Sequence, residues 1–221
     1  MKRTLTYLFD PLCGWCYGAG APLARIISST GVNLELLPSG LFSGHGARPM
    51  DEAMASHAWS TDQRIETLTG QPFSIDYLTQ VLCNRHQPLD STAATLALTA
   101  VAQTEPAREF ETLQHIQHAR YVGGKNITER HTLINLLDAL GLFDAANALR
   151  VTSSTLLNDT QQRIDRACAL MNEMDVHGVP CFVMTHDNTR RTLPASMLFA
   201  QPMHFTRQIY GISEAELDNL L

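Results

Sequence analysis

The sequence of 221 residues lacks any apolar run long enough to span a membrane, so no transmembrane segment is expected. It also lacks a basic excess, because 16 Lys and Arg stand against 22 Asp and Glu for a formal net charge of −6. This balance argues against nucleic acid as a main partner. With no internal repeat or low-complexity segment, the length fits one large domain or a small domain carrying an insertion.

The chain has no disulfide framework, since its five cysteines are odd in number. The short stretch before the first apolar run leaves no room for a signal peptide, so we expect a cytosolic protein, where structural disulfides are rare. A second C-x-x-C and an H-x-x-x-H pair are both absent, which disfavours zinc. A zinc site and a structural pair of core cysteines stay open as alternatives.

The most informative stretch that is present is Cys13-Gly14-Trp15-Cys16, which follows an apolar run and precedes a helix-like segment. A cysteine at a helix N-terminus meets unpaired backbone N–H groups and the positive end of the helix dipole, and both favour the thiolate. We therefore expect Cys13 to attack disulfides and Cys16 to resolve the mixed disulfide. Trp15 is expected to form an apolar docking patch or to pack on its own helix.

Strand patterns lie at the two ends of the chain, with about a hundred helical residues between them. The predicted strands are residues 3–9, 32–37, 179–184 and 191–193, and the last of them continues loosely at 196–199. The predicted flanking helices are residues 14–29, 154–174, 201–210 and 214–220. The first two strands and their helix form a right-handed β-α-β unit. The loop at 38–50 leaves the same sheet edge as the cysteines and is expected beside them. One α/β domain interrupted by a helical one is predicted.

Gly178-Val179-Pro180 forms a second motif, at the head of a strand. Proline cannot donate a ladder hydrogen bond there. A cis Val179–Pro180 bond would leave the backbone N–H and C=O of Val179 free to pair with an extended peptide lying across Cys13. An ordinary trans proline is the alternative, and the local sequence leaves both open, because only about 5–6% of X–Pro bonds are cis.

Both motifs resemble those of a known family. Residues 9–17, FDPLCGWCY, resemble the active-site segment of DsbA-like thioredoxin-fold oxidoreductases, and residues 178–183, GVPCFV, are similar to their cis-proline segment. The likeness is strongest to the branch of FrnE-type proteins and bacterial protein-disulfide isomerases, and residues 40–41, 48–53 and 68–73 extend it over almost the whole chain.

The resemblance implies an α/β, thioredoxin-like fold with a helical domain inserted between an N-terminal β-α-β unit and a C-terminal β-β-α unit. It also implies a cis bond before Pro180. We place the thioredoxin-like domain at residues 1–44 and 151–221 and the helical insertion at 45–150.

Two positions depart from the family pattern. Cys181 stands where the family usually has Thr or Ser, and we interpret it as a buried small residue rather than a third redox thiol. Gly14-Trp15 differs from the Pro-His of periplasmic oxidants, and these two residues influence the redox potential. Two polar residues near the motifs receive structural interpretations: Asp10 caps a backbone N–H rather than assisting proton transfer at Cys16, and His177 is a solvated turn residue.

Together these features predict a thiol–disulfide oxidoreductase, with Cys13 and Cys16 catalytic and with Trp15, Val179 and Pro180 binding substrate. The reductase or isomerase direction is expected in the cytosol. No metal or organic cofactor is expected, because the dithiol is itself the redox group, and glutathione is a candidate reductant. The expected partners are protein or peptide disulfides, neither nucleic acid nor membrane, and the oligomeric state stays open.

Two rival functions remain at this stage. One is a glutathione-dependent transferase or isomerase on the same scaffold, which a glutathione pocket between the sheet and the helical insertion would favour. The other is a non-catalytic binding module.

Overall fold

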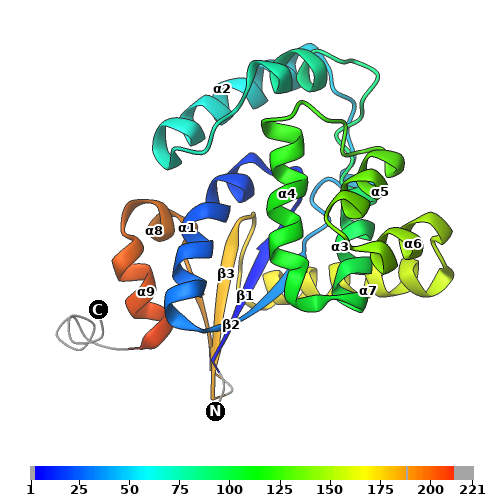
Figure 1. Cartoon of the computed structure of the whole chain (residues 1–221). Helices are drawn as coiled ribbons and strands as arrows, with labels where there is room; N and C mark the ends of the chain where they lie inside the picture. Colours follow the sequence, from blue (N-terminus) through cyan, green and yellow to red (C-terminus); the bar gives the residue numbers. More distant parts are fainter. Residues whose placement is uncertain (1–2, 188, 212–221) are drawn as a thin grey trace.

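The structure is a computed structural model that describes residues 3–187 and 189–211 (Figure 1). Its described strands are β1 (Thr4–Phe9), β2 (Asn33–Pro38), β3 (Cys181–His186) and β4 (Thr189–Leu193), and they form one sheet in the order β2-β1-β3-β4. β1 pairs parallel with β2 and antiparallel with β3, and β3 pairs antiparallel with β4. The register sets Leu8 opposite Cys181, so the end of β1 and the start of β3 meet at one sheet edge.

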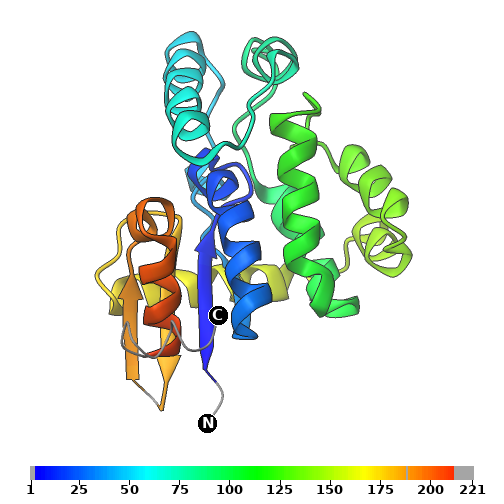
Figure 2. The ribbon, with the colours of Figure 1, turned by 60° about the vertical axis from the view of Figure 1, so that its left-hand side comes forward.

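Helices cover both faces of the sheet. α1 (Gly14–Thr30), α8 (Ala195–Ala200) and α9 (Pro202–Tyr210) pack together on one face, and α7 (Ser154–Glu173) crosses the other (Figures 1 and 2). α1 ends where sequence reasoning placed its end, because Gly31 adopts a left-handed φ of 60° and its N–H bonds back to Ile27. The mixed α/β arrangement predicted from the terminal strand patterns is confirmed.

A helical insertion lies between β2 and α7. Its elements are α2 (Glu52–Thr69), a π-helical turn (Tyr77–Leu82), α3 (Thr92–Thr104), α4 (Glu109–Tyr121), α5 (Arg130–Ala139) and α6 (Phe143–Val151), with 3₁₀ turns at Gly44–Gly46 and Pro106–Arg108. Asp51 caps α2 as its position predicts, since its Oδ1 accepts the Met54 N–H at 2.8 Å. In Figure 1, α2 lies across the N-terminal end of α1, so the insertion covers the turn that holds the two cysteines.

Alternation along the strands separates two buried clusters. Tyr7 and Phe182 stack with ring centroids 5.0 Å apart in the cluster that includes Cys13 and α1. Leu8 and Cys181 belong to the other cluster, against Ala167 of α7. Cys181 therefore occupies the α7 side of the sheet as a buried small residue, which agrees with its predicted role.

Two local predictions need comment. The interpretation of residues 196–199 as loosely extended is wrong, because Ala195–Ala200 is helical. That helix buries Leu198 and sets the Phe199 ring 5.7 Å from the Trp15 ring, a long-range contact that the local sequence does not reveal. The predicted helix at 214–220 lies outside the described residues.

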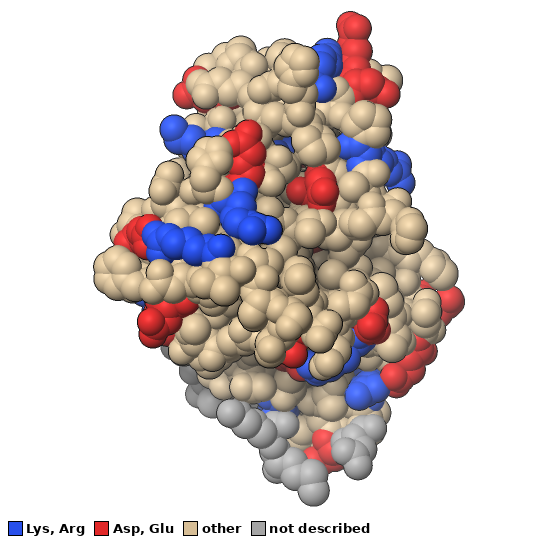
Figure 3. All heavy atoms as spheres, turned by 90° about the vertical axis from the view of Figure 1, so that its right-hand side faces the viewer, with Lys and Arg blue, Asp and Glu red and all other residues tan. Residues whose placement is uncertain are grey.

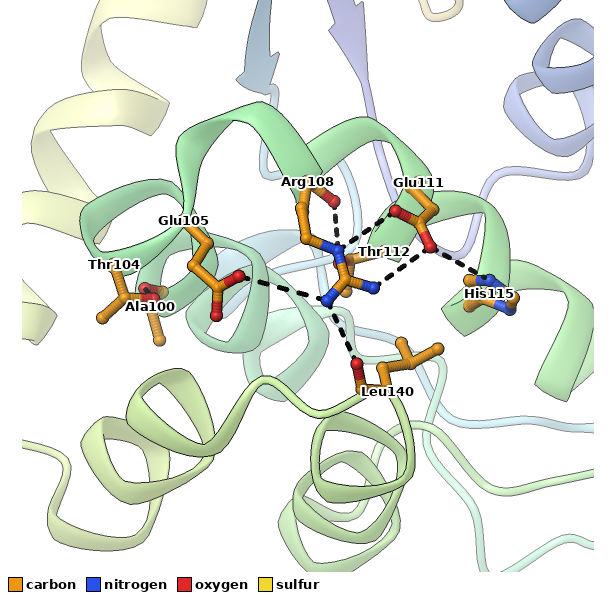
Figure 4. Close-up of polar contacts among 8 residues, drawn as sticks. All are labelled: Ala100, Thr104, Glu105, Arg108, Glu111, Thr112, His115 and Leu140. Atoms are coloured by element: carbon orange, nitrogen blue, oxygen red, sulfur yellow. Dashed lines mark hydrogen bonds and ion pairs between the residues drawn. The ribbon is translucent and has the colours of Figure 1, made fainter.

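Arg108 connects the start of α4 to the end of α5 by hydrogen bonds (Figure 4). Its guanidinium donates to the Leu140 carbonyl at 3.1 Å and to both carboxylate oxygens of Glu111 at 3.1 and 3.2 Å. His115 lies 3.7 Å from the same carboxylate. Across residues 3–187 and 189–211, no group of three or more His, Cys, Asp or Glu side chains gathers as a metal site would require.

The face of the molecule in Figure 3 carries basic and acidic side chains scattered among uncharged ones, without a large area of one sign. Among the described helices, none has the length and apolar character needed to cross a bilayer.

Candidate active site

Cys13 is the N-cap of α1. Its extended backbone (φ −84°, ψ 116°) turns the chain from β1 into the helix, and its Sγ accepts the Cys16 backbone N–H at 3.4 Å. Cys13 is 7% exposed, whereas Cys16 is completely buried. The structure thus sets both thiols at the first turn of α1, with the outer sulfur at the helix N-terminus, where the dipole favours negative charge.

The deep burial of Cys16 raises the pKa of its thiol. Desolvation raises the pKa of Cys16 well above its ordinary value, and its interaction with Cys13 raises it further. The backbone beneath is held rigidly, because the buried Tyr7 hydroxyl donates to the Cys16 carbonyl at 3.0 Å. Burial therefore favours the protonated form of Cys16 and shields its sulfur from solvent.

Val179 lies directly against Cys13, and Pro180 follows it in the chain. The Val179–Pro180 bond is cis, as the family resemblance implies. The expectation that the Val179 carbonyl is free is wrong, because the Cys13 thiol donates to this oxygen at 3.6 Å. No described residue accepts a hydrogen bond from the Val179 N–H.

Asp10 stabilises the turn before the cysteines by accepting three hydrogen bonds. Its Oδ1 accepts the Leu12 N–H at 2.9 Å, while its Oδ2 accepts the Phe42 N–H at 3.1 Å and the Ser91 hydroxyl at 2.8 Å. Burial raises its pKa, and these three hydrogen bonds act against that rise. With both oxygens occupied by donors from three segments, Asp10 is a structural cap, as its position in the sequence suggested.

A cavity of about 250 Å³ opens beside Cys13, between the start of α1 and the helical insertion. Most of its wall is apolar, and the loop predicted to lie near the thiols contributes Leu41 and Phe42. The polar side chains of the insertion that line it are His57, Thr61, Asp62, Tyr77, Arg120 and Tyr121. Cys13 therefore shares the cavity with polar side chains that lie outside both sequence motifs.

Asp62 of α2 lies against the turn that holds the two cysteines. A β-carbon added to Gly14 would stand only 2.2 Å from its Oδ1, so the carboxyl reaches the helix start because residue 14 has no side chain. Its Oδ2 accepts the Tyr77 hydroxyl at 2.9 Å. Desolvation by burial raises the pKa of Asp62 to about 7, against the opposing effects of Tyr77 and the Arg120 charge.

Arg120 of α4 is an unusual buried cation at 2% exposure. Its guanidinium carbon lies 5.5 Å from the ring centroid of Tyr77 and 5.8 Å from that of Tyr121. Its Nε has no hydrogen-bond partner, and no described carboxylate lies within ion-pair distance of it. Its positive charge lies close enough to the Tyr77 hydroxyl and the Asp62 carboxyl to oppose the rise in pKa that burial causes at both groups.

Sequence reasoning missed Asp62 and Arg120, because each belongs to a helix far from the cysteine motif. Little in the sequence marks either residue as functional. Asp62 lies three residues before Ile65 and Arg120 directly precedes Tyr121, and both of these neighbours are buried. A charge in such a position on a buried helix face indicates a functional or structural pairing, but the partner comes from another element.

A second, apolar groove of about 360 Å³ lies on the Pro180 side of the thiols. Trp15, which is half-buried, lines both this groove and the cavity. Leu68, which is 51% exposed, and Phe199 complete the apolar wall beside it. Trp15 therefore lines both the groove and the cavity and also packs against Phe199 of α8.

The remaining residues singled out from the sequence lie apart from this site. Burial raises the pKa of Cys181 to about 11, on the far face of the sheet. The His177 side chain is 87% exposed and lies 3.2 Å from the Asp175 carboxylate, as a solvated turn residue would. Cys83 and Cys168 belong to exposed positions of other segments.

The sequence model of a family described as "DSBA-like thioredoxin domain" matches residues 4–211. The chain belongs to this family. Among solved structures, this DSBA-like protein is similar to "Cytosolic disulfide reductase DsbM from Pseudomonas aeruginosa", with 32% identity, a TM-score of 0.83 and coverage of 94% of this chain and 97% of that one.

A second structure of that reductase, with GSH, matches the DSBA-like chain at 31% identity and a TM-score of 0.81, covering 94% of this chain and 98% of that one. No curated protein matches the chain. Membership in a family of thiol–disulfide oxidoreductases fits the dithiol and the cis proline found together at this site.

Proposed function

We propose that this protein is a disulfide reductase, in which Cys13 attacks a protein or peptide disulfide, Cys16 resolves the mixed disulfide and glutathione restores the dithiol. The observation that carries the proposal is the position of the Cys13 sulfur, at the N-cap of α1 and 3.6 Å from the Val179 carbonyl beside Pro180. This arrangement sets the nucleophile next to backbone groups able to hold an extended chain.

The reaction divides between the two thiols according to their burial. The Cys13 thiolate attacks one substrate sulfur, and the other leaves as a thiolate that takes up a proton. Cys16 then loses its proton and attacks the Cys13 sulfur, which releases the second substrate thiol and leaves a Cys13–Cys16 disulfide. Because Cys16 is completely buried, it meets the mixed disulfide but not a second substrate.

Val179 holds the substrate backbone in this scheme. Once the Cys13 sulfur has bonded to substrate, it no longer donates to the Val179 carbonyl, which becomes free to accept a peptide N–H, and the Val179 N–H is free to donate to a peptide carbonyl. The groove formed by Trp15, Leu68 and Phe199 takes an apolar side chain next to the disulfide.

The cavity beside Cys13 suits a small thiol rather than a polypeptide. The buried Arg120 cation offers a partner for a carboxylate, and glutathione carries two carboxylates and one thiol. The similar reductase structure with GSH supports the same assignment. The groove and the cavity share Trp15, so the oxidising substrate and the reductant would occupy neighbouring but separate surfaces.

The reductase direction in the cytosol is supported by the described activity of the similar reductase, at 32% identity. A glutathione-dependent transferase or isomerase is the second candidate, since the cavity lies next to the insertion, where such a pocket was expected. That chemistry does not use a resolving thiol, whereas in the proposed reductase Cys16 displaces the second substrate thiol from Cys13.

The test is reduction of a protein disulfide by glutathione in the presence of the protein. Cys13→Ser should abolish the catalysed reaction, while the control Cys83→Ser, at an exposed cysteine away from the site, should leave it unchanged. Full activity in Cys13→Ser would refute the proposal. A transferase activity that survives Cys16→Ser would favour the second candidate.

A further inference from the structure

One polar group of the cavity has no part in the scheme above. We propose that Asp62 is the general base that takes the proton from a small thiol as it enters the cavity to reduce the Cys13–Cys16 disulfide. The proposal rests on the proposed function, and it adds a residue from the helical insertion to the chemistry at α1.

The geometry of the carboxyl suits this role. Tyr77 holds one oxygen by its 2.9 Å hydrogen bond, and no described residue donates to the other. That second oxygen, Oδ1, lies against Gly14, the residue next to the nucleophile, at the wall of the cavity. By contrast, Asp10 has donors on both oxygens and is not available as a base.

The charged and titratable groups that line the cavity with Asp62 come from α1, α2, the π-helical turn and α4, and the other lining segments contribute only apolar residues. These charged and titratable groups are Cys13 at the start of α1, His57 on α2, Tyr77 on the π-helical turn, and Arg120 and Tyr121 on α4. Arg120 stabilises the ionised carboxylate across the cavity, and Tyr77 stabilises it by direct donation. Neither neutralises it by ion pairing, so its negative charge remains available to a proton.

Burial gives the carboxyl a suitable basicity. Because desolvation raises its pKa to about 7, Asp62 is partly ionised at neutral pH and far more basic than an ordinary carboxylate. A free thiol has a pKa of about 8.5, so proton transfer to Asp62 is only slightly unfavourable. A base with a pKa near the working pH gives the best compromise between ionised fraction and basicity.

The step balances in protons and electrons. The Asp62 carboxylate takes the proton of R–SH, and the resulting sulfur attacks Cys13, forming R–S–S–Cys13 and breaking the Cys13–Cys16 bond. The electron pair leaves on the Cys16 sulfur, which takes up a proton as Asp62 gives one up to solvent. A second R–SH then displaces Cys13, yielding R–S–S–R and the dithiol, so two thiols are oxidised for one protein disulfide reduced.

A purely electrostatic role for Asp62 would act in the opposite direction. A negative charge at the cavity wall repels an incoming thiolate, so removing it would accelerate the reaction at high pH. A general base instead makes the protonated thiol reactive, so removing it slows the reaction where free thiolate is scarce. The sign of the change therefore distinguishes the two roles.

The test is single-turnover reduction of the oxidised protein by glutathione, followed by tryptophan fluorescence from pH 5.5 to 9. The wild-type rate should rise up to about pH 7 and then flatten, because the ionised fraction of Asp62 saturates. Asp62→Asn should be slower by about ten-fold or more at pH 7, and its rate should keep rising toward the pKa of the free thiol at about 8.5.

Three further variants assign the titration. Glu52→Gln, which removes an exposed carboxylate of the same helix, should keep the wild-type profile. His57→Gln alters the cavity wall, so its rate is free to change, but its profile should still flatten near pH 7, which excludes the imidazole as the base. Tyr77→Phe should move the flattening to higher pH, because the lost hydrogen bond favours the ionised carboxylate.

Parallel profiles for the wild type and Asp62→Asn, or a faster variant, would overturn the inference. So would a wild-type protein that glutathione does not reduce. That last result would also remove glutathione as the reductant in the proposed function. The attack of the reduced protein on a peptide disulfide, measured separately, tests the roles of Cys13 and Cys16 independently of Asp62, so a failure of the inference alone leaves that attack intact.

Discussion

The thiol of Cys13 donates a hydrogen bond to the carbonyl of Val179, a residue 166 positions away in the chain, across 3.6 Å. The antiparallel pairing of β1 with β3 brings the two together, since it sets Leu8 opposite Cys181 at the sheet edge. The nucleophile and the backbone proposed to hold its substrate are therefore distant in the chain but adjacent in the fold. Any change that loosens this pairing would separate them.

Gly14 should tolerate no side chain. In Gly14→Ala the new methyl would stand 2.2 Å from Asp62 Oδ1 and 3.3 Å from Ile65 Cδ1, so the Asp62 side chain or α2 itself must move. We expect a loss of about 1–3 kcal/mol in the free energy of unfolding, measured by urea titration. The matched control is Gly20→Ala on the same helix, whose methyl would find its nearest neighbour at 3.6 Å and should gain about 0.5–1 kcal/mol from helix propensity. Equal effects of the two changes would contradict the packing described here.

Asp62 should make stability depend on pH in a defined direction. Its folded-state pKa is raised, so the folded protein holds a proton that the unfolded chain loses above pH 4, and Asp62 lowers stability progressively from about pH 4 to pH 7. The rise from 3.8 to about 7 corresponds to as much as about 4 kcal/mol.

Asp62→Asn should therefore gain stability over the wild type as pH increases from 4 to 8, measured by urea unfolding at each pH. Glu52→Gln, at an exposed position, should follow the wild type. A constant difference between Asp62→Asn and the wild type across this range would show that the carboxyl titrates normally.

Arg120 should distinguish anionic thiols from neutral ones. Arg120→Met keeps an unbranched side chain over the Tyr77 and Tyr121 rings but removes the charge. We expect the KM for glutathione to rise by about ten-fold, as for loss of one charge-assisted hydrogen bond. The KM for 2-mercaptoethanol, which has no carboxylate, should change little. Equal losses for both thiols would mean that Arg120 acts only through packing.

Cys181 should be dispensable for catalysis. Its side chain lies on the α7 face of the sheet, and burial raises its pKa to about 11, so it remains a thiol near neutral pH. We expect Cys181→Ala to retain disulfide reductase activity, and iodoacetamide at pH 8 to leave Cys181 unmodified in the folded protein. Loss of activity in a variant that still folds would assign it a redox role.

Local patterns in the sequence predicted the parts of this structure that depend on neighbouring residues. The apolar runs predicted the strands, and Asp51 and Gly31 marked helix ends, because a cap acts within a few residues. The cis bond before Pro180 needed the family resemblance, since the dipeptide alone does not determine it.

The sequence did not predict the groups that meet only in the folded state. Asp62 and Arg120 reach the cavity because α2 and α4 pack around α1, and no spacing along the chain encodes that approach. The helix at residues 195–200 packs Phe199 against Trp15, about 180 residues earlier in the chain, and local propensity does not reveal such a contact.

The most direct test of the account is trapping of the mixed disulfide. A peptide disulfide mixed with reduced Cys16→Ser should give a stable adduct of one protein with one peptide half, located at Cys13 by mass spectrometry, because the resolving thiol is absent. Cys13→Ser should give none, since Cys16 is completely buried. An adduct on Cys16 in Cys13→Ser, or none on Cys13 in Cys16→Ser, would contradict the assignment of nucleophile and resolving thiol.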